Sequence, residues 1–206
     1  MILTKYLENP VREEGCKKFK KTVILDLDET LINSTEKSKF NFVKNADKMI
    51  DPRTRCEDMD GYYLVFERPN LQEFLDYLFT NFNVSVWTAA TKDYAIFIVK
   101  KFIQTKENRD IDFLLFKNHC EYCKEQNGGM KDLDILWDDY KLPGYSKENT
   151  IIIDDYDRVY KTNTSAKKNK INNCYKIKPF LFSKKISLED NELPVLQEYL
   201  EEWKQT

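Results

Sequence analysis

Apolar residues recur along the chain with two periods, one typical of buried strands and the other of amphipathic helices. Compact runs of β-branched and aromatic residues predict strands at 21–28, 62–67, 83–88, 113–116 and 150–154. Apolar residues three and four positions apart predict helices that begin at Pro69, after Thr91 and at Glu192. Because strands alternate with helices at this spacing, we expect an α/β fold with a parallel sheet and helices on both faces.

The remaining segments lack this regular pattern. Residues 1–20 are polar and mixed, so we expect an N-terminal arm followed by a single domain over 21–206. Residues 36–66 begin with a charged, weakly periodic stretch, which predicts a small insertion within that domain. Residues 161–176 are rich in Lys and Asn, which is typical of a loop.

Composition narrows the class of protein. The chain has 206 residues, of which 41% are hydrophobic, enough for one domain with a sizeable core. Its net charge of −2 does not suit a protein that grips nucleic acid by bulk charge, so we expect no direct nucleic-acid contact. No apolar run approaches the ~20 residues of a membrane span, and none is expected. The five cysteines favour a reducing compartment, so we expect an intracellular protein, nuclear or cytoplasmic.

Scarce residue types exclude several classes of enzyme. His119 is the single histidine, so zinc proteases with an HExxH motif and His-rich di-metal phosphatases cannot be built here. No glycine-rich nucleotide loop occurs, and no cysteine is followed six residues later by an arginine, as in cysteine-dependent phosphatases. The stretch from His119 to Cys123 supplies only half of a zinc site. Aspartate is the abundant residue type that remains.

Acidic side chains stand where two predicted strands end. Asp26 and Asp28 stand at the end of the first strand, and Asp154 and Asp155 stand at the end of the strand 150–154. In α/β folds the chemistry lies at the carboxyl ends of the strands, so we expect these carboxylates to meet. Carboxylates that stay ionised together need a cation, and hard oxygen ligands without His or Cys indicate Mg²⁺.

A hydroxyl and an amine complete the set. Thr88 ends the strand 83–88, and Lys131 precedes Asp132, which we expect to cap a short helix. A metal, a lysine and a hydroxyl around one Asp form a receptor for a phosphoryl group, and that Asp can act as a nucleophile. Taken singly, each of these residues also has a plainer interpretation as a helix cap, a turn residue or a solvated charge.

The order of these residues resembles the haloacid dehalogenase (HAD) superfamily, and in detail its RNA polymerase II C-terminal-domain (CTD) phosphatases. The matching motifs run, in chain order, through DLDETL at 26–31, RPxxxEFL at 68–75, WTA at 87–89, LFxxHC at 115–120, KDL at 131–133, IDD at 153–155, NxxxI at 173–177 and DxEL at 190–193. The resemblance implies a HAD-like Rossmannoid sheet in which 36–66 is the small β insertion after the first motif. It also implies that His119 and Cys120 lie at a structural strand end.

The resemblance assigns a role to each candidate. Asp26 would be the nucleophile and a metal ligand, and Asp28 the general acid/base, with its backbone carbonyl on Mg²⁺. Asp155 would bind Mg²⁺ directly, supported by Asp154. The substrate phosphate would be held by Thr88, Lys131 and Thr30, and Thr30 would also close the first motif and orient its loop.

These roles imply a Mg²⁺-dependent phosphatase of phosphoserine and phosphothreonine in proteins, acting through an aspartyl-phosphate. The RNA polymerase II C-terminal repeat is one candidate substrate, and the partner expected is a phosphorylated protein or peptide. Two alternatives stay open: a HAD hydrolase of a small metabolite or a nucleic-acid 3′-phosphate, and a non-catalytic binding module of the same fold.

Two further features bear on the substrate. The stretch 156–160 lacks the Ser-Pro of the small and nuclear-envelope members and is closer to the larger, transcription-associated ones. Residues 161–178 contain six lysines and no acid. They form either a solvated loop or an electrostatic guide for an acidic phosphopeptide.

Overall fold

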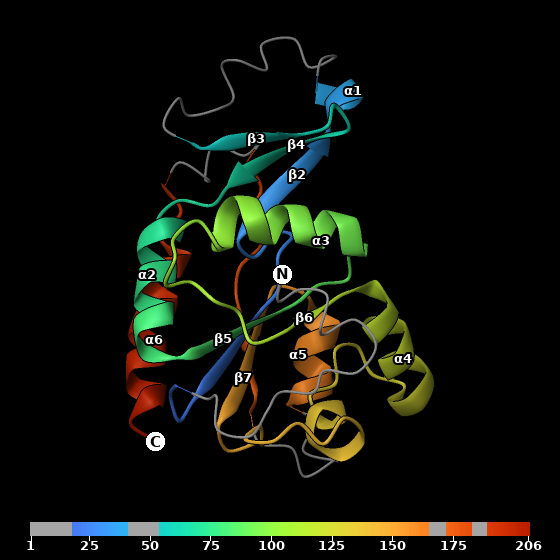
Figure 1. The fold of residues 1–206 in the computed structure, drawn as a ribbon, viewed down its shortest axis with the longest axis vertical. Helices are drawn as coiled ribbons and strands as arrows, with labels where there is room; N and C mark the ends of the chain where they lie inside the picture. The colour runs from blue at the N-terminus through green and yellow to red at the C-terminus, as the bar shows by residue number, and fades with distance from the viewer. Residues whose placement is uncertain (1–17, 41–53, 165–171, 183–188) are drawn as a thin grey trace.

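A five-stranded parallel sheet forms the centre of the molecule (Figure 1). The computed structural model describes residues 18–40, 54–164, 172–182 and 189–206. The strand order is β6-β5-β1-β7-β8, and the strands are β1 (Thr22–Leu25), β5 (Asn83–Trp87), β6 (Leu114–Leu115), β7 (Thr150–Asp154) and β8 (Cys174–Lys176). All neighbouring strands in this sheet pair in parallel, so the predicted α/β architecture is confirmed.

Two apolar cores lie on opposite faces of the sheet because side chains alternate along each strand. Val23 and Leu25 of β1 face the first core, which is covered by α2 (Leu71–Asn81), α3 (Lys92–Ile98) and α6 (Glu192–Lys204). Ile24 faces the second core, which is covered by α4 (Lys117–Asn127), the π-helix η4 (Ile135–Asp139) and α5 (Asp157–Asn163). Helices therefore cover both faces, as predicted (Figure 1).

The predicted helix after Thr91 changes its geometry part of the way along. Thr91 is the N-cap of α3, although its side chain makes no capping hydrogen bond. From Val99 to Ile103 the helix continues as a π-helix, η3. The apolar face predicted for this segment is buried throughout, namely Ala95, Ile98, Val99 and Phe102.

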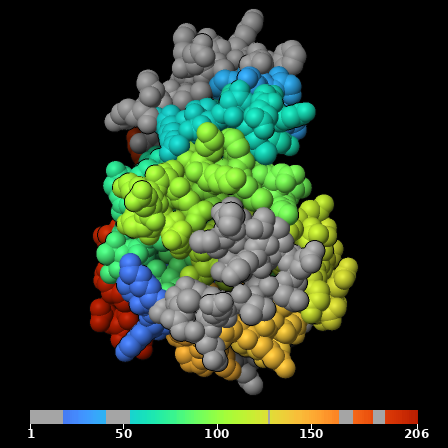
Figure 2. All heavy atoms as spheres, viewed as in Figure 1, coloured from blue at the N-terminus to red at the C-terminus, as the bar shows by residue number. Residues whose placement is uncertain are grey.

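A second, antiparallel sheet lies between the first motif and α2. It has the order β2-β4-β3, with β2 (Ile32–Glu36), β4 (Tyr63–Glu67) and β3 (Cys56–Met59), and α1 (Lys37–Phe40) follows β2. Figure 2 shows β3 and the β3–β4 turn, in cyan, at one end of the molecule beside the green α3. The division into an arm at 1–20, a domain at 21–206 and an insertion at 36–66 stays a prediction, and most of the arm and residues 41–53 lie outside the described residues.

Two motifs that are far apart in the sequence meet at Arg68. Its guanidinium is fully buried and forms two 2.9 Å hydrogen bonds to the Asp190 carboxylate. It also donates to the carbonyl of Thr30 at 2.8 Å and to that of Lys178 at 2.8 Å. The RPxxxEFL and DxEL motifs therefore form one ion pair that holds the end of the first motif against the C-terminal segment.

Four local expectations were wrong. The short helix that Asp132 was expected to cap is the π-helix η4, whose N-cap is Asp134. Helix α2 begins at Leu71 with Asn70 as its N-cap, so Pro69 stands before the helix rather than at its first position. His119 and Cys120 lie in the first turn of α4, not at a strand end. The stretch 161–176 is not all loop, because α5 runs through Asn163 and β8 begins at Cys174, while 165–171 lie outside the described residues.

Across the described ranges, no helix is both long and apolar enough to cross a membrane.

Candidate active site

The order of the strands brings the predicted motifs together. β1 lies between β5 and β7, so the residues that follow these three strands become neighbours. Asp26 follows β1 directly, and its N–H donates to the carbonyl of Ile153 in β7 at 3.0 Å. Thr88 follows β5, and its N–H donates to the carbonyl of Leu115 at 3.0 Å. The DLDETL, WTA and IDD motifs thus share one edge of the sheet, as expected for a parallel sheet.

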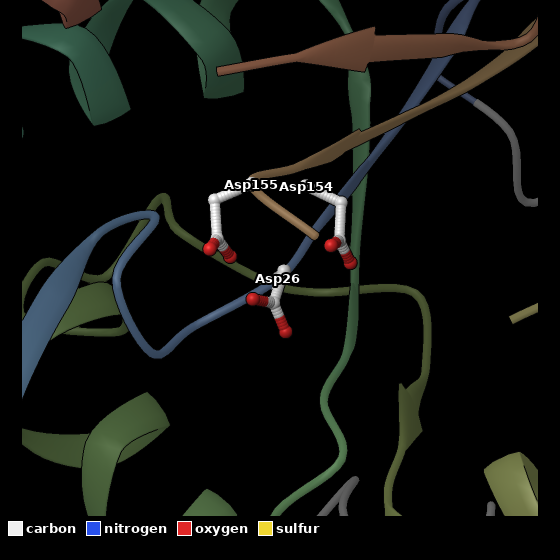
Figure 3. A group of neighbouring side chains, drawn as sticks. All are labelled: Asp26, Asp154 and Asp155. Atoms are coloured by element: carbon white, nitrogen blue, oxygen red, sulfur yellow. The ribbon is translucent and has the colours of Figure 1, made fainter. Parts of the chain in front are cut away.

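Three carboxylates meet at this edge. Figure 3 shows the side chains of Asp154 and Asp155 extending from the end of β7 toward Asp26. One carboxylate oxygen of each residue lies within 4.8 Å of the others. Burial, and then the negative charge of Asp26, raises the pKa of Asp155 to about 6, and the same two causes raise the pKa of Asp154. A cation at this point would remove the repulsion.

Lys131 supplies one positive charge to the cluster. Its side chain is only 3% exposed, and its ammonium lies 2.5 Å from Asp26 and 2.7 Å from Asp154. Burial would lower the pKa of Lys131, but these two carboxylates outweigh burial and raise it. The amine therefore stays protonated, and three carboxylates face one ammonium.

The cluster fits a magnesium ion. Its donors are hard oxygens, and no His or Cys of the described chain belongs to it. Asp154 already accepts hydrogen bonds from Lys131 and from the N–H of Tyr156, at 2.7 and 2.8 Å. No Lys or Arg of the described residues pairs with Asp155, so its carboxylate is available as a direct ligand. The carboxylate of Asp28 lies outside the cluster. The role expected for its backbone carbonyl on Mg²⁺ stays a prediction.

Asp28 has its own set of partners. The hydroxyl of Tyr94 donates to Oδ1 of Asp28 at 2.6 Å, and that of Ser34 donates to the same atom at 3.5 Å. Burial raises the pKa of Asp28 to about 6, with Asp26 adding to the rise and Tyr94 opposing it. A carboxyl group with this pKa can both donate and accept a proton near neutrality. The sequence contained no signal for Tyr94 or Ser34, since neither belongs to a motif.

The two threonines point to different tasks. Thr88 follows the C-terminal end of β5 and is buried. Its hydroxyl accepts a hydrogen bond from the N–H of Ala90 at 3.1 Å. Thr30 is fully buried and its hydroxyl donates to Oδ2 of Asp26 at 3.4 Å. Thr30 therefore contacts the aspartate itself, and the role expected for both residues on a substrate phosphate stays a prediction.

The remaining candidates are structural or already paired. His119 accepts the N–H of Phe116 on Nδ1 at 3.1 Å, which fixes the first turn of α4. Burial raises the pKa of the Cys120 thiol to about 11, so it stays a thiol near neutrality.

The described lysines of the segment 161–178 are also engaged. Lys161 and Lys176 both pair with Asp157, at 2.5 and 2.6 Å, and Lys178 pairs with Glu192 at 2.6 Å. Two carboxylates thus offset most of the charge of these three lysines, which weakens their part in a guide for acidic peptides. The other three lysines of the segment lie outside the described residues.

Comparisons with known proteins find relatives over most of the chain. A family model described as NLI interacting factor-like phosphatase matches residues 21–206. The putative CTD phosphatase-like protein 355R of Invertebrate iridescent virus 6 is 40% identical over 186 residues, covering 87% of this chain and 97% of that protein. Its namesake in Invertebrate iridescent virus 3 is 37% identical over 193 residues, with 90% and 97% covered.

More distant similarities extend to cellular proteins. The ubiquitin-like domain-containing CTD phosphatase 1 of Xenopus laevis is 28% identical over 195 residues, which cover 93% of this chain and 58% of that protein. Among solved structures, the fission yeast RNA polymerase II CTD phosphatase Fcp1-R271A bound to beryllium fluoride superposes with a TM-score of 0.53 at 21% identity. The match covers 90% of this chain and 53% of the yeast chain, so it shows a shared fold over about half of that protein.

Proposed function

The chain belongs to the NLI interacting factor-like phosphatase family, the CTD phosphatase-like branch of the HAD superfamily. We propose that it is a Mg²⁺-dependent phosphatase that acts on phosphoserine and phosphothreonine in proteins. One observation carries the proposal: Lys131 lies within 2.7 Å of both Asp26 and Asp154, inside the carboxylate cluster. This arrangement supplies a nucleophile, a positive charge and a cation site at one point.

In the first proposed step, a carboxylate oxygen of Asp26 attacks phosphorus. The bond from phosphorus to the serine or threonine oxygen breaks, and the electron pair stays with that oxygen. Asp28 donates a proton to it, so that a neutral alcohol leaves and an aspartyl-phosphate forms on Asp26. The pKa of about 6 for Asp28 supports this role, because a fraction of the group is protonated near neutrality.

In the second proposed step, Asp28 acts as a base. Its carboxylate accepts a proton from a water molecule, whose oxygen attacks the phosphorus of the aspartyl-phosphate. The phosphorus–carboxylate bond breaks, which releases inorganic phosphate and restores the Asp26 carboxylate. Tyr94 holds the Asp28 carboxylate in place through both steps by its 2.6 Å hydrogen bond.

Charge balance accounts for the rest of the site. Asp26, Asp155 and the backbone carbonyl of Asp28 would hold Mg²⁺, with Asp154 in support. When bound, Mg²⁺ neutralises the negative charge that develops on the phosphoryl oxygens. Lys131 would neutralise a further part of that charge and orient Asp26. Thr88 would donate its hydroxyl to a phosphoryl oxygen, and Thr30 would hold the second oxygen of Asp26.

The choice of a protein substrate rests on the names of the relatives and on the size of the insertion. The viral and vertebrate relatives are named as CTD phosphatases or CTD phosphatase-like. The described part of the insertion is a three-stranded sheet and one turn of helix, which is small for a cap that would enclose a metabolite. These points favour a phosphorylated protein over a sugar phosphate, and the C-terminal repeat of RNA polymerase II is the first candidate to test.

The decisive experiment is a substrate panel. Peptides with phosphoserine, phosphothreonine or phosphotyrosine are compared with sugar phosphates and 3′-phosphorylated oligonucleotides, each with Mg²⁺ and with EDTA. We expect the highest kcat/KM on a phosphoserine or phosphothreonine peptide, and activity that EDTA abolishes and Mg²⁺ restores. A metabolite that exceeds every peptide by orders of magnitude would favour the first alternative. Binding of phosphopeptides without turnover would favour the non-catalytic one.

A further inference from the structure

The last turn of α5 holds the loop that carries Lys131. The hydroxyl of Thr162 accepts the N–H of Met130 at 3.1 Å. The side-chain amide of Asn163 donates to the carbonyl of Lys131 at 3.0 Å, and its oxygen accepts the N–H of Leu133 at 3.0 Å. Two adjacent residues of one helix thus contact three backbone groups of the loop: one before Lys131, one in Lys131 itself and one after it.

The loop needs such support because its backbone is unusual. Lys131 has φ of 47°, the left-handed region that residues with a Cβ rarely adopt. A conformation of this kind persists only where the surroundings determine it. Asn163 is 1% exposed and donates its second amide hydrogen to the carbonyl of Val159 at 3.1 Å, so its orientation is fixed within α5.

The approach of the two segments is also close. A Cβ added to Gly129 would lie 2.7 Å from Cγ2 of Thr162, a distance that real Cβ atoms do not show. The loop therefore lies directly against α5 at the position before Met130. Helix α5 begins at Asp157, two residues after Asp155. The same short helix therefore connects the IDD motif at 153–155 with the loop that carries Lys131, here called the lysine loop.

We propose that Thr162 and Asn163 are positioning residues for Lys131, which they hold so that its ammonium reaches Asp26 and the substrate phosphate. The inference rests on the proposed function, since it assigns a purpose to the location of Lys131. Neither residue touches the reacting atoms, and both act through the backbone of the loop. Loss of either contact releases the left-handed turn and moves the ammonium, and a displacement of about 1 Å can reduce a rate about 100-fold.

The chain offers a closely matched control. Asn173 is also buried, and its side-chain amide also donates to two backbone carbonyls, those of Lys147 and Thr150, at 2.5 and 2.7 Å. These contacts lie away from the lysine loop. The N–H of Asn173 also donates to the carbonyl of Asn163 at 3.4 Å, and Asn173→Ala keeps this backbone contact. We expect Asn163→Ala and Asn173→Ala both to lower the urea midpoint of unfolding. With p-nitrophenyl phosphate, well below both midpoints, Asn163→Ala should reduce kcat/KM by about 10- to 100-fold, whereas Asn173→Ala should stay within about twofold.

A double-mutant cycle with Lys131→Met tests whether Asn163 acts through the lysine. In the Lys131→Met background, Asn163→Ala should cause little further loss of kcat/KM, because there is no ammonium left to misplace. Losses that multiply would overturn the proposal, as would equal losses in Asn163→Ala and Asn173→Ala.

A second pair of variants serves if Asn163→Ala does not fold. Thr162→Val keeps the shape of the side chain but removes the acceptor for Met130, whereas Thr162→Ser keeps the acceptor. We expect a lower kcat/KM in Thr162→Val and a value near that of the wild-type protein in Thr162→Ser. Equal values in the two variants would overturn the proposal. Failure of the proposed function would look different: the wild-type protein would prefer a metabolite to every phosphopeptide, which leaves the comparison with p-nitrophenyl phosphate valid, or it would show no turnover at all. If there is no turnover, hydrogen exchange of the Leu133 amide still tests whether Asn163 holds the loop. We expect this exchange to be faster in Asn163→Ala than in the wild-type protein and unchanged in Asn173→Ala.

Discussion

The hydroxyl of Tyr94 in α3 lies 2.6 Å from Oδ1 of Asp28, and this hydrogen bond joins the first motif to a helix 66 residues away in the sequence. Tyr63 of the small sheet packs edge-on against the same tyrosine, with the ring centroids 5.9 Å apart. The proposed acid/base is therefore oriented from outside its own motif, by α3 and by the insertion. A carboxylate that must both donate and accept a proton gains from a partner that fixes its position.

The first prediction removes this partner. Tyr94→Phe keeps the ring and its packing but deletes the donor to Asp28. We expect kcat on a phosphoserine peptide to fall about tenfold, because general acid–base catalysis is worth about 10²–10⁴-fold and only its orientation is lost. Tyr145→Phe is the matched control, since the hydroxyl of Tyr145 donates to Asp112 at 2.8 Å away from the site. Equal kcat values in the two variants would show that the hydrogen bond to Asp28 does not matter.

The second prediction concerns the single histidine, which gives one unambiguous NMR signal. Burial lowers the pKa of His119, and Nδ1 accepts a backbone hydrogen bond that protonation would break. We expect the imidazole to titrate below 6.5, the ordinary value. The unfolded chain then binds the proton first as the pH falls, so this residue lowers the stability of the fold progressively below about pH 6.5.

The stability consequence can be measured separately. In His119→Asn, the urea midpoint should fall less steeply between pH 7.5 and 5 than in the wild-type protein, because the titrating group is gone. A histidine signal that titrates at or above 6.5 would contradict the prediction, as would identical pH slopes in the two proteins.

The strands could be predicted because short runs of β-branched and apolar residues are typical of buried strands. The run from Thr150 to Asp154 is β-branched and apolar, and it became a fully buried strand with two carboxylates at its end. The first motif follows a similar run. Parallel pairing then places the ends of β1, β5 and β7 side by side, so the location of Asp26, Thr88 and Asp154 followed from the pattern alone.

Other elements could not be recognised in the same way. Helix α4 has the sequence KNHCEYCKEQN, in which the buried positions include His119, Cys120 and Cys123 rather than large aliphatic residues. Helix α5 buries Val159 and Asn163 in a stretch that reads as polar loop. Tyr94 and Asn163 were missed because their importance lies in contacts with Asp28 and Lys131, and such contacts between distant segments leave no periodic signal.

The third prediction uses the close approach at Gly129. Gly129→Ala should destabilise the protein by about 1–3 kcal/mol, because the new methyl group cannot fit beside Thr162 without moving the loop or α5. Activity should fall as well, because the shift displaces Lys131. Gly128→Ala is the control: Gly128 has φ of 67° but open space around its Cβ position, so it should cost stability without loss of kcat/KM.

A second substitution can confirm the cause of this effect. Thr162→Ser removes Cγ2, the atom nearest to the new methyl group, and keeps the hydroxyl that accepts the N–H of Met130. Combined with Gly129→Ala, it should restore much of the stability and activity. No recovery in the double variant would mean that the clash with Thr162 is not the reason for the loss.

The last prediction separates the two carboxylates of the first motif. Asp26→Asn should leave no detectable turnover and no phosphorylated protein, because an amide is a very poor nucleophile. Asp28→Asn should fold, bind orthovanadate and still react with an aryl phosphate, whose leaving group needs little protonation. Hydrolysis of the aspartyl-phosphate needs a base to activate water, and loss of that base should slow this step by about 10²–10⁴-fold. The intermediate should therefore accumulate in Asp28→Asn. A rapid-quench experiment should show a burst of the phenol, and mass analysis should locate the phosphoryl group on Asp26. A label on any other residue, or the absence of a burst in Asp28→Asn when the wild-type protein is active, would mean that the two roles are reversed or that no aspartyl-phosphate forms.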